Sequence, residues 1–258
     1  MIKLIDVRAG YENKEVIHGI NVTFEPGKIT ALIGPNGCGK STLLKTLVRI
    51  IKHTEGNVLV DGEDVEQLSA VKLARKVAYL PQNKKAPDIT VLRMVLHGRF
   101  AYLSYPRRYR EQDVEIAKKA LCWAGMEHKE DEIVSRLSGG MQQKVYIAMA
   151  LAQDADTVLM DEPTTCLDVA HQLRLMELVK KLAADGKSVV MVLHDLTQAL
   201  QIADKVVVMK DGEIIAQGTA DEVYESGSLQ SAFEVQVERV ETQNQWTYFC
   251  KLKESMSV

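Results

Sequence analysis

One short segment near the N-terminus constrains this chain more than any other. Residues 34–41 have the sequence GPNGCGKS, which matches G-x-x-x-x-G-K-[ST] at every fixed position, and Thr42 follows. A strand-like apolar stretch, Lys28–Ile33, precedes the segment, and a stretch with helical spacing, Ser41–Ile51, comes after it. Strand, glycine loop and helix in this order predict a phosphate-binding loop, because glycines let backbone N–H groups close around an anion at a helix start.

The motif predicts the chemistry of its individual residues. We expect Lys40 to reach the β- and γ-phosphates of a nucleotide and the Ser41 hydroxyl to bind Mg²⁺. The predicted phosphate-binding set is Gly34, Pro35, Asn36, Gly37, Cys38, Gly39, Lys40, Ser41 and Thr42. The alternative, a glycine turn that matches by chance, is disfavoured by the flanking strand and helix patterns.

Length and composition limit the remaining possibilities. The chain has 258 residues, enough for one large domain or two lobes, and its net charge of −3 gives no reason to expect a nucleic-acid partner. No apolar run reaches the roughly 18 residues of a membrane span, and the N-terminus is too short and charged for a signal peptide, so we expect a cytosolic protein. The spacing of the four cysteines favours reduced thiols over disulfides or zinc.

Strand and helix patterns alternate on both sides of a helical middle segment. Residues 2–33 are predicted to form strands, among them 16–24 and 28–33, which a turn separates. Further strands are predicted where short apolar runs are bounded by turn residues, at 56–62, 77–80, 157–160, 187–193, 205–209, 213–216, 235–239 and 246–252. Helices are predicted where apolar residues recur at helical spacing, at 41–51, 69–76, 90–97, 111–124, 140–153 and 169–185. The near-continuous apolar runs at 157–160 and 187–193 indicate a parallel sheet buried on both faces. Only helical patterns occur between about 84 and 153, which predicts a helical insertion.

Two acids, Asp161 and Glu162, directly follow the strand-like run Val158–Met160. Ligands of α/β sheets bind at the carboxyl ends of strands, so these carboxylates are expected beside the phosphate loop. One of them can hold Mg²⁺ through water, and the next can polarise an attacking water. A strand that simply ends in surface acids is the alternative.

A second pair of glycines opens a later helix, in the sequence LSGGM at residues 137–141. Glycines at a helix N-terminus expose N–H groups to an anion, so this is a second candidate anion site. A flexible helix start is the alternative.

Taken in order, these motifs resemble those of an ABC-transporter ATPase subunit over almost the whole chain. Residues 34–41 match the Walker A loop, Leu137–Gly140 the ABC signature and Val158–Asp161 Walker B. The other matches are Tyr11 as the aromatic that stacks on adenine, Gln82 as the Q-loop glutamine, Glu162 as the general base, Thr165–Asp168 as the D-loop and His194 as the switch histidine. Alone, Tyr11 would also fit a surface aromatic and His194 a strand-end histidine, and His171 is interpreted as structural.

The resemblance implies an α/β fold with a P-loop NTPase core, an N-terminal antiparallel β subdomain and an inserted α-helical lobe. The core would comprise residues 1–83 and 156–258, and the lobe 84–155. The implied cofactors are ATP and Mg²⁺, with Lys40, Glu162 and His194 catalytic and with Ser41, Gln82 and Asp161 as metal ligands. The implied assembly is a head-to-tail homodimer, in which the partner's ATP is contacted by the signature residues Ser138, Gly139, Gly140 and Met141. The D-loop, with Asp168, would run past the partner's Walker A region.

Three further segments resemble one group of this family, the importers for iron–siderophore complexes, haem and cobalamin. They are Val95–Phe100, Ile147–Gln153 and Asp161–Gln172. This resemblance implies a polytopic membrane permease as partner, an indirectly coupled extracytoplasmic substrate-binding protein, and a peripheral position on the cytoplasmic face of the cell membrane. Two alternatives remain: a soluble ABC scaffold of iron–sulfur cluster assembly, and a non-transport ABC ATPase acting on DNA or ribosomes. The second usually has paired ATPase units or a coiled-coil insertion, and neither is seen.

Some residues depart from the family pattern or stand out from it. Met141 replaces the usual glutamine of the signature and cannot donate a hydrogen bond to nucleotide, and Lys144 replaces an arginine. Residues 99–110 contain four arginines, four aromatics and no acid, which fits either a permease or lipid contact or a solvated loop. Cys38, beside Lys40 and a helix start, is expected to favour its thiolate and to approach Cys166 across a closed dimer; small residues filling tight turns are the alternative.

Overall fold

A six-stranded sheet with the strand order β10-β9-β3-β8-β7-β6 forms the centre of the fold. The computed structural model describes residues 1–12, 14–82, 85–242 and 245–252. The strands of this sheet are β3 (Ile29–Ile33), β6 (Val77–Leu80), β7 (Thr157–Asp161), β8 (Ser188–Val192), β9 (Lys205–Lys210) and β10 (Glu213–Gly218). All neighbours pair in parallel except β10, which pairs antiparallel with β9. Every residue of β3, β7 and β8 is buried, because other elements cover both faces of the sheet.

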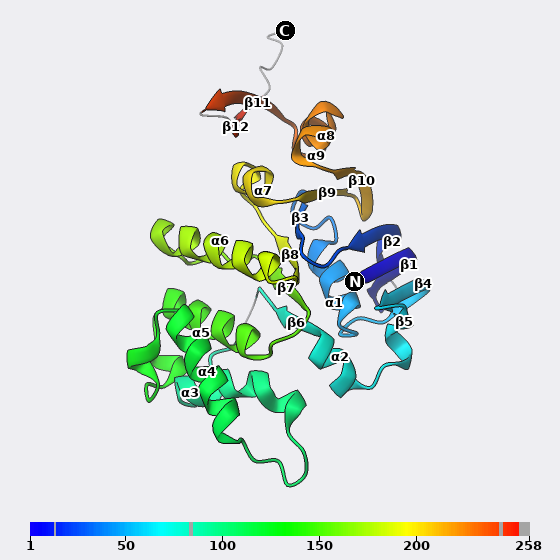
Figure 1. Ribbon diagram of the computed structural model, residues 1–258. Helices are drawn as coiled ribbons and strands as arrows, with labels where there is room; N and C mark the ends of the chain where they lie inside the picture. Colours follow the sequence, from blue (N-terminus) through cyan, green and yellow to red (C-terminus); the bar gives the residue numbers. More distant parts are fainter. Residues whose placement is uncertain (13, 83–84, 243–244, 253–258) are drawn as a thin grey trace.

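A second, antiparallel sheet covers one of these faces (Figure 1). Its order is β2-β1-β4-β5, and its strands are β1 (Ile2–Tyr11), β2 (Lys14–Phe24), β4 (His53–Val60) and β5 (Glu63–Asp64). Successive strand side chains point to opposite faces, so β8 supplies Val190 and Val192 to the core under this sheet and Val189 and Met191 to the core on the other side. Helix α1 (Lys40–Leu47) fills the space between the two sheets.

The described residues between β6 and β7 form helices and loops that pack on one another. They comprise α3 (Val91–Leu96), η2 (His97–Tyr102), α4 (Glu111–Trp123), η3 (Glu127–Lys129), η4 (Val134–Arg136) and α5 (Gly139–Ala152). Side-chain caps begin two of these helices, since Thr90 accepts from the backbone of Arg93 and Ser138 from that of Met141. This helical segment packs below α6 (Val169–Ala184), against the face of the central sheet opposite the antiparallel sheet.

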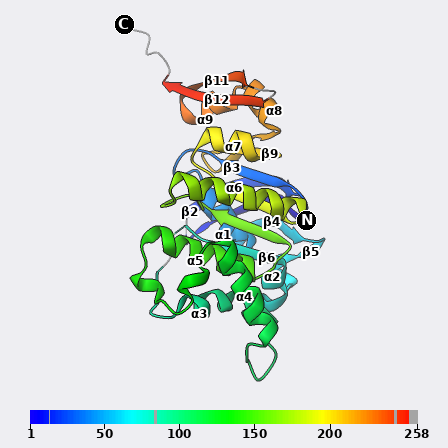
Figure 2. The ribbon, with the colours of Figure 1, turned by 60° about the vertical axis from the view of Figure 1, so that its left-hand side comes forward.

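The C-terminal elements lie at the other end of the molecule from the helical segment, as Figures 1 and 2 both show. They are α7 (Leu196–Ile202), α8 (Ala220–Glu225), α9 (Ser228–Phe233) and the hairpin β11 (Val235–Thr242) and β12 (Gln245–Leu252). The Arg239 guanidinium lies between the rings of Tyr224 and Trp246, at 4.6 and 4.4 Å from their centroids, and pairs with Asp221. These contacts fasten the hairpin to α8.

The structure confirms the predicted α/β fold, the parallel central sheet and the strands and long helices inferred from the sequence. Ser69 caps α2 (Ala70–Lys76) by accepting from the backbone of Lys72, as predicted. The short helices α7, α8 and α9 and the 3-10 turn η1 (Val65–Gln67) were not predicted. In the part of the chain that the structure describes, no helix combines the length and apolar composition of a membrane span.

Candidate functional site

The predicted phosphate loop connects β3 to α1, as its sequence context requires. Gly34 and Gly39 have φ angles of 155° and 102°, and a Cβ on Gly34 would lie 2.2 Å from the backbone oxygen of Met209. Glycine is therefore needed at these positions. Lys40, the first residue of α1, is buried and donates from Nζ to the backbone oxygens of Gly34 at 2.7 Å and Pro35 at 2.8 Å. Its ammonium group thus lies against the loop in which a phosphate would be held.

Asp161 ends β7 beside the start of α1. The Ser41 hydroxyl donates to its Oδ1 at 3.0 Å, and the Tyr79 hydroxyl donates to its Oδ2 at 3.4 Å. The carboxylate is only 1% exposed, and this burial raises its pKa, with the neighbouring Glu162 charge adding to the rise. Ser41 and Gln82 line one cavity, and Asp161 lies behind Ser41 in hydrogen-bond contact with its hydroxyl. A hydroxyl, an amide oxygen and a carboxylate are the oxygen donors that Mg²⁺ prefers. Tyr79, within β6, is a site residue that sequence analysis missed, since a single tyrosine in a strand carries no motif.

Glu162 and His194 face each other across the ends of β7 and β8. His194 Nε2 lies 2.5 Å from Glu162 Oε1, so the ring nitrogen is in direct contact with the carboxylate. The Glu162 side chain is 11% exposed and the His194 side chain 47%. The Glu162 carboxylate can therefore accept a proton from a water molecule while the His194 ring holds the carboxylate in a fixed orientation.

A cavity of about 370 Å³ brings most of these predicted site residues together. Its lining consists of Val16, Asn36, Gly37, Gly39, Lys40, Ser41, Thr42, Gln82, Glu162 and His194. The signature residues Ser138–Met141 and the D-loop residue Asp168 are not among the described residues that line it. Within one chain, the phosphate loop therefore lies beside the candidate base Glu162, whereas the signature residues do not line this cavity.

Tyr11 lies at the tip of the β1–β2 hairpin and is 48% exposed. Its hydroxyl accepts from Lys45 Nζ of α1 at 3.3 Å, which turns the ring toward the helix that follows the phosphate loop. The hairpin is also joined to that loop through the backbone: His18 N–H donates to Gly212 O at 2.9 Å, and Gly212 N–H donates to Cys38 O at 3.2 Å. An exposed ring held in this way is suited to stack on a nucleotide base.

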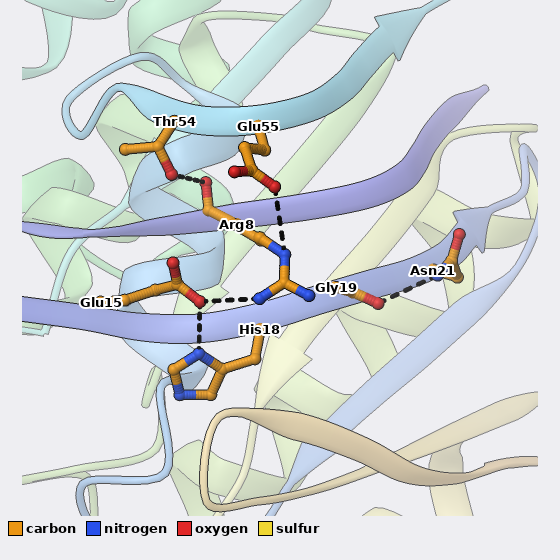
Figure 3. Close-up of polar contacts among 7 residues, drawn as sticks. All are labelled: Arg8, Glu15, His18, Gly19, Asn21, Thr54 and Glu55. Atoms are coloured by element: carbon orange, nitrogen blue, oxygen red, sulfur yellow. Dashed lines mark hydrogen bonds and ion pairs between the residues drawn. The ribbon is translucent and has the colours of Figure 1, made fainter.

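A polar network across β1, β2 and β4 supports the same hairpin (Figure 3). Arg8 Nη1 donates to Glu15 Oε1 at 3.1 Å, and Arg8 Nε lies 3.4 Å from Glu55 Oε2. His18 Nδ1 is 2.6 Å from the same Glu15 oxygen, and the hydrogen bonds from His18 and then from Arg8 lower the pKa of Glu15. The network ties β1, β2 and β4 together.

Two expectations for individual residues were wrong. Burial raises the pKa of the Cys38 thiol, and this outweighs the opposing effect of Lys40, so the thiolate is disfavoured rather than favoured. Arg99 is not part of an exposed basic surface, because it is 7% exposed and forms a buried ion pair with Asp113 at 3.2 Å. The other three arginines of the 99–110 segment, Arg107, Arg108 and Arg110, are exposed, and their contact with a permease stays a prediction.

A strand–loop–helix phosphate site beside paired carboxylates at the edge of a parallel sheet defines a nucleotide-binding P-loop protein. The family model described as ABC transporter matches residues 17–165, more than half of the chain. The chain belongs to the ABC transporter family and is an ATP-hydrolysing enzyme of that family, which confirms the resemblance seen in its motifs.

Two curated relatives align over most of their length. One is the petrobactin import ATP-binding protein FpuD of Bacillus anthracis, 40% identical over 88% of this chain and 84% of the relative. The other is the iron(3+)-hydroxamate import ATP-binding protein FhuC of Bacillus subtilis (strain 168), 41% identical over 90% of this chain and 87% of the relative.

Two solved structures are similar along the chain. A chain from an ABC transporter assigned to the metal-chelate type, in an inward-facing conformation, superposes with a TM-score of 0.82 at 26% identity, covering 98% of each chain. A bacterial ABC transporter cassette solved as a dimer superposes with a TM-score of 0.77 at 31% identity, covering 85% of this chain and 99% of the other.

Proposed function

We propose that this protein is the ATP-hydrolysing subunit that powers import of a metal chelate, specifically an iron–siderophore complex, through a separate membrane permease. The observation that carries the choice of cargo is the pair of relatives at 40% and 41% identity, whose names assign them to petrobactin and iron(3+)-hydroxamate import. Neither name refers to haem or cobalamin, the other cargoes implied by the family resemblance, or to iron–sulfur assembly, DNA or ribosomes.

The residues of the cavity divide the reaction among them. The N–H groups of the glycine loop and the Lys40 ammonium bind the phosphates of ATP, with Lys40 exchanging its contacts to Gly34 and Pro35 for phosphate oxygens. Glu162 accepts the proton of the attacking water, and His194 keeps the Glu162 carboxylate in place.

Ser41, Gln82 and Asp161 are the residues that would hold Mg²⁺. When bound, the cation neutralises negative charge on the phosphates. The buried Asp161 carboxylate, whose hydrogen bonds come from Ser41 and Tyr79, supports this assignment, because a negative charge at such a site is favoured by a nearby cation.

The active assembly in this proposal is a head-to-tail homodimer. Ser138, Gly139, Gly140 and Met141 lie at the start of α5, and Asp168 at the start of α6, outside the cavity that holds the phosphate loop. The dimeric cassette that is similar to this chain supports a second copy as the partner. Each ATP would then lie between the phosphate loop of one protomer and the signature of the other.

We place the dimer on the cytoplasmic face of the cell membrane, held there by a polytopic permease. The extracytoplasmic binding protein would meet only the permease. We divide each protomer into a nucleotide-binding core, residues 1–83 and 156–258, and a helical lobe, residues 84–155. The support for this division is the packing of α3, α4 and α5 on one another.

Replacement of Glu162 by Gln tests the proposal. The variant should bind ATP but lose turnover by roughly 10²–10⁴-fold, the usual cost of removing a general base. Because hydrolysis is blocked, the variant should form a stable dimer when ATP is present, which light scattering detects. This dimer should elute together with the permease in detergent. Glu177→Gln on α6, an exposed surface change, is the matched control and should behave as wild type. Wild-type turnover in Glu162→Gln would remove Glu162 from this role.

A further inference from the structure

Side chains of two helices hold the segment that leads from Glu162 into α6. We call residues 162–168 the D-loop segment. Gln143 Nε2 of α5 donates to Pro163 O at 2.8 Å, and Gln172 Nε2 of α6 donates to Leu167 O at 3.1 Å. Because these hydrogen bonds attach its backbone to both helices, the D-loop segment is expected to follow α5 and α6 when they move.

The beginning of α5 packs directly against the same segment. A Cβ on Gly140 would lie 2.9 Å from Cys166 O, so the signature glycine and the D-loop backbone are already in close contact. The two pieces that the family resemblance assigns to the dimer interface are therefore neighbours within one protomer. A side-chain link one turn further along α5 reinforces this contact.

That link consists of Lys144, His171 and Asp168. The Lys144 ammonium of α5 contacts His171 Nε2, and His171 Nδ1 lies 2.7 Å from both carboxylate oxygens of Asp168. Asp168 is also the N-cap of α6, accepting from the His171 N–H at 2.9 Å. An ammonium group can only donate, so Nε2 accepts and Nδ1–H donates to the carboxylate. The geometry thus requires a neutral imidazole between a cation and an anion.

The charges around the ring make this arrangement sensitive to its protonation. Burial lowers the pKa of Lys144, and the charge of Arg174 adds to the effect, while the hydrogen bonds from the His171 backbone and then its ring lower the pKa of Asp168. Lys144 and His171 line a second cavity, of about 300 Å³. The other titratable groups that line this cavity are Arg174 of α6, Glu127 of η3 and Cys122 of α4. A protonated ring would present a second donor and a second positive charge to Lys144, and the contact between them would be lost.

We propose that His171 is a positioning residue that couples the start of α5 to the D-loop segment, so that both move as one piece when ATP closes the dimer. This rests on the proposed function, in which Ser138–Gly140 meet the partner's nucleotide and the D-loop segment lies at the same dimer interface. The link needs a neutral ring, because a protonated imidazole would present a second donor and a positive charge to the Lys144 ammonium. The sequence interpretation of His171 as merely structural is replaced by this role.

ATP turnover of the full-length protein at pH 8 and pH 6 tests the proposal. In His171→Gln, the amide oxygen can accept from Lys144 and the amide N–H can donate to Asp168, yet the side chain does not titrate. Turnover should therefore fall less between the two pH values in His171→Gln than in wild type. His171→Leu, which has neither hydrogen bond, should lose roughly tenfold in kcat at pH 8 with the KM for ATP nearly unchanged, because the phosphate loop is intact. Its loss relative to wild type should be smaller at pH 6, where a protonated ring has already lost the contact with Lys144 in wild type.

Two further variants separate this role from other titrations. His128→Gln makes the same change at a histidine that is 92% exposed, and its pH profile should match wild type. Lys144→Met removes the cation that a protonated His171 would repel, so its profile should be flatter than that of wild type. His194 is present in every variant, and a difference between profiles therefore reports on His171.

Identical pH profiles for wild type and His171→Gln, or a His171→Leu variant with wild-type kcat, would overturn the inference. Both of these results leave ATP hydrolysis itself intact, so they do not bear on the proposed function. A wild-type protein without ATP turnover at either pH would overturn the proposed function and this inference with it.

Discussion

At the scale of single residues, the environment of a side chain decides its chemistry more than its sequence neighbours do. Cys38 stands beside Lys40 at a helix start, which alone would favour a thiolate. The sulfur instead lies in the apolar core under the antiparallel sheet. Desolvation then outweighs the nearby ammonium, and the pKa of the thiol rises.

Alkylation rates should report this directly. At pH 7.5, Cys38 should react with iodoacetamide at least roughly tenfold more slowly than the exposed Cys166, because both its access and its thiolate fraction are reduced. Its rate should keep rising with pH above the range in which an ordinary thiol has ionised. Peptide mass spectrometry of timed samples measures both sites in one experiment, and Cys122 provides a second exposed reference. Equal rates at the two sites would contradict the buried position of the sulfur.

Met141 raises a second question at this scale. It is half-buried at the start of α5, and its backbone N–H points to Ser138 Oγ at 3.5 Å. A glutamine there would add one neutral hydrogen bond to the partner's nucleotide, worth about 0.5–1.5 kcal/mol, so Met141→Gln should tighten apparent ATP affinity by roughly 2- to 13-fold. Titration of ATPase activity measures this, with Met149→Gln on the same helix as control. Weaker affinity would mean that the packing of Met141 against the core matters more than the lost hydrogen bond.

At the scale of elements, the buried pair of Arg99 and Asp113 joins η2 to α4. Arg99 also donates to the backbone oxygen of Ala152 at 3.0 Å, and Asp113 accepts from the N–H of Arg110 at 3.0 Å, so one ion pair fixes three parts of the helical segment. Removing one partner leaves a buried charge uncompensated, which typically costs about 3–5 kcal/mol. Arg99→Met should lower the free energy of unfolding in urea by that amount.

The neighbouring Arg108 offers a matched control for this prediction. Arg108 is exposed, and Arg108→Met should leave the urea midpoint near that of wild type. A double variant, Arg99→Met with Asp113→Leu, should recover part of the loss, because no buried charge is left unpaired. An Arg99→Met protein as stable as wild type would show that the pair is not needed to hold η2 on α4.

The helices and strands also show which structural features could be predicted from the sequence alone. Caps such as Ser69, and the strand 157–160 with its two acids, were predictable because their signals are local or strongly periodic. Arg99 was misjudged, because nothing in its own segment reveals a carboxylate one helix further on. Lys144 and His171 lie 27 positions apart, and only the packing of α5 beside α6 brings them together.

At the scale of the whole molecule, the proposed dimer predicts that two inactive variants of this protein can restore activity when they are mixed. Lys40→Ala disables the phosphate loop, and Gly139→Asp disables the signature. A mixed dimer would contain one composite site in which both parts are intact, and half of the dimers formed from an equal mixture are mixed. The mixture should therefore recover up to about a quarter of wild-type ATPase activity. Each variant assayed alone at the same total concentration is the control, and mixed dimers without recovery would contradict a site shared between protomers.

The position of β3 in the central sheet has a consequence for how the protein folds during translation. β3 spans Ile29–Ile33, yet both strands that pair with it, β8 at Ser188–Val192 and β9 at Lys205–Lys210, come more than 150 residues later. The β1–β2 hairpin can form early during translation, whereas β3 must wait with both edges unpaired until most of the chain has emerged. At a synthesis rate of about 5–20 residues per second, that wait lasts on the order of ten seconds or more. An apolar strand exposed for so long is prone to aggregate, so the nascent chain is a natural client for chaperones that shield such strands.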